Sequence, residues 1–357
     1  MPLDPPATLP PPAETGLEKL FLFPEKSASL LNNGGLDLSY PISVELSLTH
    51  RCNLACLFCS DKEIRLSQKR VLGLGEIERL FSDLSSKGTQ GVTIEGGGEP
   101  TLAKTFSQIP QLASKFQLAL GLITNGLKLF TPLTSATFYS AFQWIRVSLD
   151  ATDEAEFKTL KGRTGFRTTL QNIEVLGKQK KGGFPVLGVG YVLNCLNDRP
   201  VKIKKLALIL RNLGVDYLHV RPVVDHPELV SSKAQLLQKS LEELKFPDFT
   251  VNADPLTDNL PTGNLGLPCL AHSLTSVISA DGLVWFCGRL NSLPGAKPIG
   301  DLFCNSFSEI WDSDKRNEAA NQVKKTSYTS KYCPRCRFTK YNLLLHKLQN
   351  LKTRDFI

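Results

Sequence analysis

The chain has 357 residues, of which 41% are hydrophobic and 21% are charged. This composition is typical of a globular protein and excludes a fibrous or largely disordered one. No run approaches the roughly 18 uncharged apolar residues that a membrane-spanning helix requires. Prolines at positions 2, 5, 6, 10, 11 and 12 interrupt the apolar core that a signal peptide would need. We therefore expect a cytoplasmic protein with no membrane partner.

The formal net charge is +8, but the basic residues are scattered in short clusters. Two of these clusters lie between Lys178 and Lys181 and between Lys202 and Lys205, and such short clusters are typical of a solvated helix face. The sequence lacks the basic stripes interleaved with aromatic residues that favour nucleic-acid binding. We therefore do not expect a nucleic-acid partner.

Residues 1–37 are a proline-rich lead-in that we expect to be extended and poorly packed. In residues 38–245, period-two strand patterns alternate with helical spacings. The predicted strands are Ile42–Leu48, Val92–Glu95, Leu118–Thr124, Trp144–Leu149, Val186–Leu193 and Tyr217–Val223. The predicted helices are Gly75–Lys87, Thr105–Phe116, Asp153–Lys161, Arg167–Lys180, Pro200–Leu213 and Ser232–Lys245.

This alternation predicts an α/β fold with right-handed βαβ units and a parallel sheet. The sheet is either an open doubly wound one or an incomplete (β/α) barrel, and periodicity does not choose between them. In both architectures, ligands bind at the carboxyl ends of the strands.

The last third of the chain has a different pattern. Residues 246–268 are rich in Pro, Asp, Asn and Gly and predict a linker. Beyond it, Leu274–Ile278 and Leu283–Phe286 predict a β-hairpin with Asp281-Gly282 at its turn. Helices are predicted over Ser306–Lys325 and from Lys340 onward. The expected domains are a lead-in, a barrel, a linker, a small α+β domain and a C-terminal helix and tail, at 1–37, 38–245, 246–268, 269–340 and 341–357.

Nine cysteines occur in a chain without an export signal, so we expect a reducing compartment and no disulfide framework. Three of them, Cys52, Cys56 and Cys59, form a C-x3-C-x2-C motif directly after the first predicted strand. Three thiolates from one loop can hold three irons of a four-iron cluster and leave the fourth iron open to a reacting ligand. A structural zinc site with His50 as fourth ligand is the alternative.

The segment around this motif resembles the radical S-adenosylmethionine (SAM) superfamily. The resemblance rests on the three cysteines, on Phe58 in the aromatic position before the last of them, and on Gly97-Gly98-Glu99-Pro100 after the second strand. It covers roughly residues 40–225 and implies an incomplete (β/α)6 TIM-like barrel.

The resemblance also implies a SAM site. In that family the amino and carboxylate groups of SAM chelate the open iron, the aromatic residue packs near the adenine, and the Gly-Gly-Glu segment holds the amino group. Polar residues at the end of the fourth strand bind the ribose, which implies Ser148 and Asp150 here. A backbone-satisfied hydroxyl is the alternative for Ser148, and a helix cap is the alternative for Asp150. The implied SAM-binding residues are Phe58, Gly97, Gly98, Glu99, Ser148 and Asp150.

Four further cysteines lie beyond the predicted linker, at Cys269, Cys287, Cys333 and Cys336. Four thiolates suffice for one fully ligated iron–sulfur cluster, and an all-thiolate zinc site is the alternative. The spacing C-x12-G-x4-C followed by C-x2-C resembles the SPASM auxiliary-cluster domain in its shortened twitch form. This resemblance implies one auxiliary four-iron cluster. The two remaining cysteines, at 195 and 304, are expected to be small buried hydrophobic residues.

The family mechanism implies reductive cleavage of SAM to a 5′-deoxyadenosyl radical that takes a hydrogen atom from a substrate carbon. It also implies an electron donor such as flavodoxin or ferredoxin. An auxiliary cluster that accepts an electron favours an oxidoreductase, with epimerisation or crosslinking as alternative outcomes. Arg221 is a candidate catalytic residue because its guanidinium suits a carboxylate, and Tyr191 is another because it lies on a strand. Weaker candidates for contact with the substrate are Glu45, Asp225 and His226.

Three functions remain open from the sequence. The first is a radical enzyme acting on a small polar molecule such as a sugar, a cyclitol or a nucleotide-linked metabolite. The second is a maturase of a ribosomal peptide, although the lead-in is too short for the leader-binding module that such enzymes often carry. The third is a non-catalytic zinc protein that binds nucleic acid or serves as a scaffold.

Overall fold

One ten-stranded sheet forms the centre of the computed structural model, which describes residues 17–32, 39–67, 70–180, 185–253, 266–293, 295–333 and 336–351. The strand order is β10-β9-β8-β1-β2-β3-β4-β5-β6-β7. Strands β8 and β1 to β7 run parallel, whereas β9 pairs antiparallel with both β8 and β10. The strands are β1 Ser43–Leu46, β2 Gly91–Ile94, β3 Ala119–Thr124, β4 Trp144–Ser148, β5 Val186–Leu193, β6 Tyr217–Pro222, β7 Thr250–Ala253, β8 Thr275–Ile278, β9 Leu283–Trp285 and β10 Gly300–Asp301.

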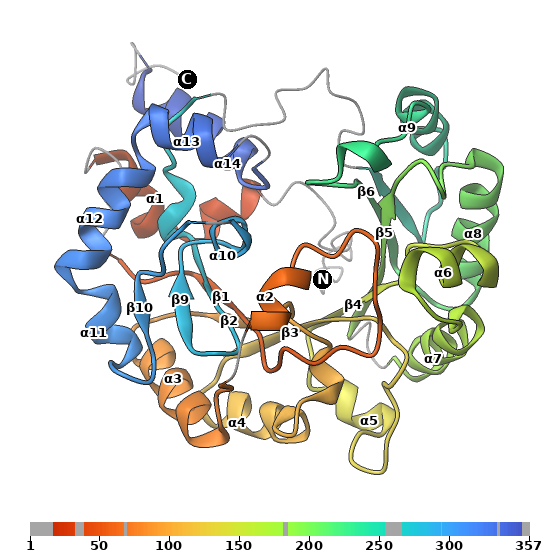
Figure 1. Ribbon diagram of the computed structural model, residues 1–357, viewed down its shortest axis with the longest axis horizontal. Coiled ribbons are helices and arrows are strands. Elements are labelled where there is room, and N and C mark those ends of the chain that lie inside the picture. The colour runs from red at the N-terminus through yellow and green to blue at the C-terminus, as the bar shows by residue number, and fades with distance from the viewer. Residues whose placement is uncertain are drawn as a thin grey trace, which may run out of the picture.

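The helices cover the outer side of this curved sheet. Figure 1 shows α3 to α8 following the outside of the parallel strands, and α11 to α14 gathered at the end formed by β9 and β10. The helices are α1 Pro24–Asn32, α2 Lys62–Ser67, α3 Leu74–Ser86, α4 Ile109–Lys115, α5 Ala136–Tyr139, α6 Glu154–Lys161, α7 Phe166–Gln179, α8 Pro200–Asn212, α9 Ala234–Glu242, α10 Gly288–Ser292, α11 Phe307–Trp311, α12 Asp314–Val323, α13 Thr326–Tyr332 and α14 Thr339–Gln349. Among the described residues, no helix has the length and apolar character needed to span a membrane.

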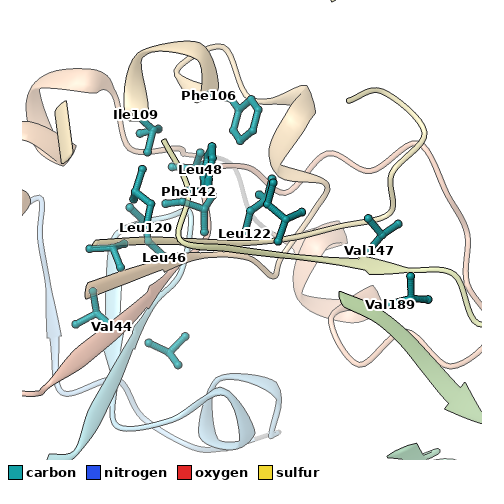
Figure 2. Close-up of a cluster of buried hydrophobic side chains, with 14 of the residues drawn as sticks. Val44, Leu46, Leu48, Phe106, Ile109, Leu120, Leu122, Phe142, Val147 and Val189 are labelled. Atoms are coloured by element: carbon teal, nitrogen blue, oxygen red, sulfur yellow. The ribbon is translucent and has the colours of Figure 1, made fainter. Parts of the chain in front are cut away.

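The main core lies between the sheet and these helices. Val44 and Leu46 of β1 are fully buried, and Phe106 and Ile109 pack from the segment that leads into α4 (Figure 2). Successive side chains of a strand point to opposite faces, so Glu45 between the two buried residues points to the inner face. Burial of apolar side chains on the outer face of the sheet therefore stabilises the fold, and the inner face can carry polar side chains such as Glu45.

Small and large residues alternate across the inner face near the amino ends of the strands. A Cβ atom on Gly121 of β3 would lie 2.3 Å from the Trp144 ring of β4. A Cβ atom on Gly188 of β5 would lie 2.0 Å from the Tyr217 ring of β6. The glycines of β3 and β5 thus make room for the aromatic rings of β4 and β6, and these rings fill the bottom of the barrel.

The incomplete TIM-like barrel and the hairpin β8–β9 are confirmed, but several segments differ from the sequence prediction, which also lacked the short helices α2, α5, α10 and α13. Residues 17–32 of the lead-in are helical, because Leu20 and Leu30 pack against Leu270 and Leu345 near the C-terminus. The predicted linker contains β7, which pairs with β6 in the sheet. The predicted helix over Ser306–Lys325 is two helices, because the Ser313 side chain caps the start of α12. Residues 1–16, 33–38, 254–265 and 352–357 of the lead-in, the linker and the tail lie outside the described residues.

The close packing of α7 against the turn after α8 yields a stability prediction. We expect Gly177→Ala to destabilise the fold by about 1–3 kcal/mol, since its Cβ atom would lie 1.9 Å from the carbonyl oxygen of Leu213. Gly75→Ala in α3 is the control, because nothing lies within 4 Å of its Cβ position. That control should be neutral or stabilising by up to about 1 kcal/mol. Thermal unfolding followed by circular dichroism measures both, and equal midpoints for the two variants would contradict the packing.

Candidate functional site

One cavity of about 1390 Å³ is bounded by the carboxyl ends of the parallel strands and by the C-terminal segment. Both cysteine groups lie on its wall, although 210 residues separate Cys59 from Cys269 in the sequence. Nearly all of the site residues expected from the sequence also lie there. The lining residues among them are Cys52, Cys56, Cys59, Cys269, Cys287, Cys333, Cys336, Phe58, Gly97, Gly98, Glu99, Ser148, Asp150 and Arg221.

The first cysteine loop follows β1 and is fastened to the end of α6. The backbone N–H groups of Ala55 and Leu57 donate to the carbonyl oxygens of Lys161 and Leu160, at 3.0 and 2.9 Å. Gly162 ends α6 in a left-handed conformation with φ 78°, which only glycine adopts without strain. The C-terminal end of α6 therefore positions the loop that carries Cys52, Cys56 and Cys59.

The thiols of both groups are electrostatically suited to a cationic metal centre. Burial raises the pKa of Cys56 to about 11, and the Lys161 ammonium opposes this rise. Burial likewise raises the pKa of Cys333 to about 12, and the neighbouring thiols Cys287 and Cys336 raise it further. Thiols that oppose one another's ionisation become thiolates readily only when a cation binds among them. The donor chemistry of the two groups thus fits the iron–sulfur clusters that the sequence implies.

No group of three His, Cys, Asp or Glu side chains in the described ranges is arranged as the ligands of one metal ion. The cysteines of a four-iron cluster each bind a different iron, so they need not converge on one point. The absence of such a group among the described residues therefore does not argue against clusters.

The Gly-rich segment after β2 lies directly against the start of the cysteine loop. The N–H of Gly98 donates to the Thr49 carbonyl at 2.7 Å, and the N–H of Glu99 donates to the Arg51 carbonyl at 2.8 Å. A Cβ atom on Gly98 would lie 2.1 Å from the Arg51 carbonyl oxygen. The two segments can approach this closely only because Gly98 has no side chain. Backbone groups of Gly97 and Gly98 consequently face the same cavity as the first cysteine group.

Glu99 is a positioning residue in this structure. Its carboxylate is 3% exposed and accepts hydrogen bonds from the Thr124 hydroxyl at 2.6 Å and from the Asn125 N–H at 2.8 Å. The N–H and the hydroxyl of Thr101 also donate to it. Burial raises the pKa of Glu99, while these hydrogen bonds lower it. Because four protein donors already occupy the carboxylate, it ties the Gly-rich segment to the end of β3.

Asp150 and Lys161 form a buried ion pair beside the first cysteine group. Both side chains are 3% exposed, and Lys161 also donates to the Ser148 carbonyl at 3.2 Å. Burial lowers the pKa of Lys161, but Asp150 and Cys56 raise it more, so its pKa lies above the ordinary value. The Lys161 ammonium lies 5.7 Å from the centre of the Phe58 ring. Lys161 therefore supplies positive charge where the sequence places the SAM-binding residues.

Two roles expected from the sequence need correction. Asp150 does not cap α6, because Asp153 is the N-cap and accepts from the Glu156 N–H at 2.9 Å. Tyr191 does not face the cavity: it is fully buried in the main core, and its hydroxyl donates to the Asn197 carbonyl at 2.8 Å. Tyr191 lies one residue from Val192, which lines the cavity, so it points to the other face of β5. Its candidacy as a catalytic residue is therefore withdrawn.

The two cysteines outside the groups, Cys195 and Cys304, are exposed rather than buried as expected. Cys195 lies in the turn that follows β5, and Cys304 in the turn that follows β10, so neither is enclosed by the core. His226 pairs with Glu228 at 3.0 Å and does not belong to the cavity lining, whereas Glu45 and Asp225 do.

Two ion pairs join the auxiliary cysteine region to the barrel across the cavity. Arg337, directly after Cys336, pairs with Glu45 of β1, and Arg289 of α10 pairs with Asp225 after β6. Burial raises the pKa of Glu45 to about 8, the charge of Glu95 adds to the rise, and Arg337 opposes it. These pairs hold the segment that carries the second cysteine group against the carboxyl ends of the strands.

Sequence reasoning missed several lining residues. Arg146 lies two residues before Ser148 on β4, so the period of the strand places both side chains on the inner face. This periodicity was a usable signal for Arg146. No sequence pattern indicated that Lys161 lines the cavity, because a lysine in the last turn of a helix is usually exposed. Asn252 lies on β7, a strand that was not predicted because its segment is rich in Pro, Asp, Asn and Gly, which are typical of a linker.

The ion pair below the first cysteine group yields a second prediction. We expect Lys161→Met to destabilise the protein by about 3–5 kcal/mol, because Asp150 would remain as a buried, unpaired charge. Lys178→Met is the control, since its pair with Glu174 is exposed and should change stability by about 1 kcal/mol or less. Adding Asp150→Asn to Lys161→Met should recover part of the loss. Unfolding of the three variants in urea measures these differences, and equal losses for the two lysine variants would refute the interpretation.

Two family models match the chain. The radical SAM superfamily model matches residues 46–207, and the SPASM model, described as an iron–sulfur cluster-binding domain, matches residues 269–337. The solved structure of SuiB from Streptococcus suis bound to its precursor peptide SuiA superposes with a TM-score of 0.62 at 15% identity, covering 92% of this chain and 78% of that one. The structure of anSMEcpe with bound AdoMet gives 0.59 at 16% identity, covering 86% and 95%. At such identities the likeness concerns the fold alone.

Curated relatives carry the name GTP 3′,8-cyclase. The protein of that name from Aquifex aeolicus is 32% identical over 222 residues, which are 58% of this chain and 67% of the relative. The probable GTP 3′,8-cyclase of Pyrococcus abyssi is 32% identical over 156 residues, which are 44% and 49%. The chain spans about half the length of several such relatives. The two matched domains imply S-adenosylmethionine and two four-iron clusters as cofactors. The chain belongs to the radical SAM superfamily and carries a SPASM domain on its C-terminal side.

Proposed function

We propose that this enzyme abstracts a hydrogen atom from a small polar substrate, such as a sugar, a cyclitol or a nucleotide-linked metabolite. The observation that carries the proposal is the single cavity whose wall includes both cysteine groups. A substrate in that cavity lies between the two cluster sites, so one end can face the radical and another can face the auxiliary cluster. The cavity of about 1390 Å³ must also hold SAM, which leaves space for a small molecule.

When bound on its reduced cluster, SAM supplies a 5′-deoxyadenosyl radical that takes hydrogen from carbon. The chain contributes binding and orientation. Cys52, Cys56 and Cys59 would hold the SAM cluster, and the backbone of Gly97 and Gly98 would contact the amino group of SAM. Ser148, Phe58 and Asp150 line the same cavity and are the candidates for contact with the ribose and the adenine. The remaining groups exclude water and fix the substrate carbon near the radical.

The second cysteine group is proposed to hold an auxiliary cluster that accepts one electron from the substrate radical. Loss of a hydrogen atom followed by loss of an electron and a proton oxidises the substrate by two electrons. Arg289 and Arg337 flank these cysteines and oppose the rise in pKa of Cys333 and Cys336 that burial causes. An oxidoreductase with a small electron carrier such as flavodoxin or ferredoxin as donor follows from this proposal.

Cyclisation of a nucleotide is the second candidate outcome. It is supported by the similarity to relatives named GTP 3′,8-cyclase. These relatives support a nucleotide-linked substrate as well, although the match spans only part of their length. A peptide substrate draws support from SuiB only through the fold, and the volume of the cavity favours a smaller molecule.

Exchange of the first cysteine group tests the radical chemistry. We expect Cys56→Ala to abolish 5′-deoxyadenosine formation under dithionite and to lower the iron content from about eight to about four per chain. Cys304→Ala is the control, because this exposed thiol lies outside both groups, and it should retain full iron and full cleavage. Anaerobic iron and sulfide analysis with chromatography of the nucleoside products gives both readouts. Full cleavage by Cys56→Ala would end the proposal.

Exchange of the second group separates electron transfer from SAM cleavage. A Cys333→Ala/Cys336→Ala variant should still form 5′-deoxyadenosine but little oxidised product, because the substrate radical has no acceptor. The product is measured by mass spectrometry of candidate metabolites. Its mass is lower than that of the substrate by about two daltons, because the oxidation removes two hydrogens. A folded variant that forms product at the unaltered rate would show that the auxiliary cluster takes no part in the chemistry.

A further inference from the structure

Side chains that carry nitrogen donors lie in a row across the inner face of the barrel, on strands β4 to β7. In the sequence, these strands lie between the two cysteine groups. Gly190 of β5 is paired with His219 of β6, and His219 is paired with Asn252 of β7. Arg146 of β4 extends beside this row, since a Cβ atom on Gly190 would lie 3.7 Å from its Cδ and 3.9 Å from its Nε. Arg146, His219 and Asn252 all line the cavity. Because Gly190 has no side chain, the Arg146 side chain can lie against β5 at this position.

Two buried donors of this row are unused. Arg146 Nε and Asn252 Nδ2 are buried, and neither has a hydrogen-bond partner among the residues that the structure describes. An unsatisfied buried donor costs roughly 1–3 kcal/mol, and more when the group is charged, so such groups are usually paired in the working protein. Arg146 and Asn252 therefore have hydrogen-bonding capacity that the described residues do not use and that an acceptor group of a ligand can use.

Three carboxylates of the cavity wall already have cationic partners, so they do not neutralise the charge of Arg146. Asp150 pairs with Lys161, Asp225 pairs with Arg289, and Glu45 pairs with Arg337. Arg221 lies two residues after His219 on β6, so its side chain is on the same inner face of that strand, and it lines the cavity as Arg146 does. Arg146 and Arg221 on β4 and β6 are accompanied on this side by Glu242 of α9 and by the paired Asp225, whereas Glu45, Glu95 and Asp61 belong to β1, to the residue after β2 and to the cysteine loop.

We propose that Arg146, with Asn252 and the neighbouring His219 and Arg221, forms an oxyanion subsite for a phosphate or carboxylate group of the substrate. This inference rests on the proposed function and narrows its substrate to an anionic molecule. A guanidinium donates two parallel hydrogen bonds to such a group, and the amide N–H of Asn252 can donate a third from β7, on the far side of β5 and β6. The anion anchors one end of the substrate on β4 to β7. Its uncharged remainder then extends toward the first cysteine group.

The experiment measures anion binding separately from SAM binding. The full chain is loaded anaerobically with iron and sulfide, and inorganic phosphate or citrate is titrated calorimetrically at constant ionic strength in chloride. SAM is titrated in parallel. We expect Arg146→Gln to bind the preferred anion about tenfold more weakly, the cost of losing one charge-assisted hydrogen bond, with unchanged affinity for SAM. The preferred anion distinguishes a phosphate-bearing from a carboxylate-bearing substrate.

Arg211→Gln is the matched control, because Arg211 forms a surface ion pair with Asp248 on the outer side of the barrel, and it should bind the anion as the unaltered protein does. Asn252→Leu removes the amide donor without removing charge, and it decides the question if Arg146→Gln does not fold. Failure of the unaltered protein to bind either anion would overturn the subsite, as would unaltered binding by Arg146→Gln. A parallel loss of SAM affinity would instead assign Arg146 to SAM. Formation of 5′-deoxyadenosine is measured separately, so a protein that cleaves SAM but binds no anion refutes the subsite alone.

Discussion

The parallel pairing of β8 with β1 is the constraint on which the site depends. Four residues of β8, Thr275 to Ile278, are in register with Ser43 to Leu46 of β1, so the C-terminal segment continues the barrel sheet. The first cysteine group follows β1 directly, and Cys287 follows the hairpin partner of β8. This pairing therefore places both groups at one cavity. A C-terminal domain tethered only by a flexible linker would not define the distance between the two cluster sites.

Ion pairs and buried hydrogen bonds reinforce this arrangement at the cavity wall. Arg337 reaches Glu45 on β1 and Arg289 reaches Asp225 beyond β6, so the auxiliary segment is held at two separated points of the barrel. Partly buried ion pairs contribute little to the free energy of folding, because desolvation offsets much of the attraction between the charges. They mainly restrict the relative orientation of the two segments that they join. Their contribution here is to orient the second cysteine group relative to the first.

The SAM half of the cavity depends on close contact between backbone segments. Glu99 links the Gly-rich segment to β3, and the C-terminal end of α6 fastens the cysteine loop. Lys161 adds a buried cation, paired with Asp150, beside Cys56 of the first cysteine group. Arg146, His219 and Asn252 line the same cavity from β4, β6 and β7, and Glu45 lines it from β1.

The sequence by itself determined the alternation of strands and helices, the two cysteine groups and the glycine-rich segment. These are local features, since periodicity, capping and ligand spacing depend on neighbours along the chain. It did not determine that residues 17–32 form helices or that β7 lies within the expected linker, because both are stabilised by packing against distant segments. The face on which Tyr191 lies, the partner of Asp150 and the unused donors of Arg146 and Asn252 were likewise decided only by tertiary structure. A side chain's partner depends on which segments the sheet brings together, and the pairing of β8 with β1 joins segments more than 200 residues apart.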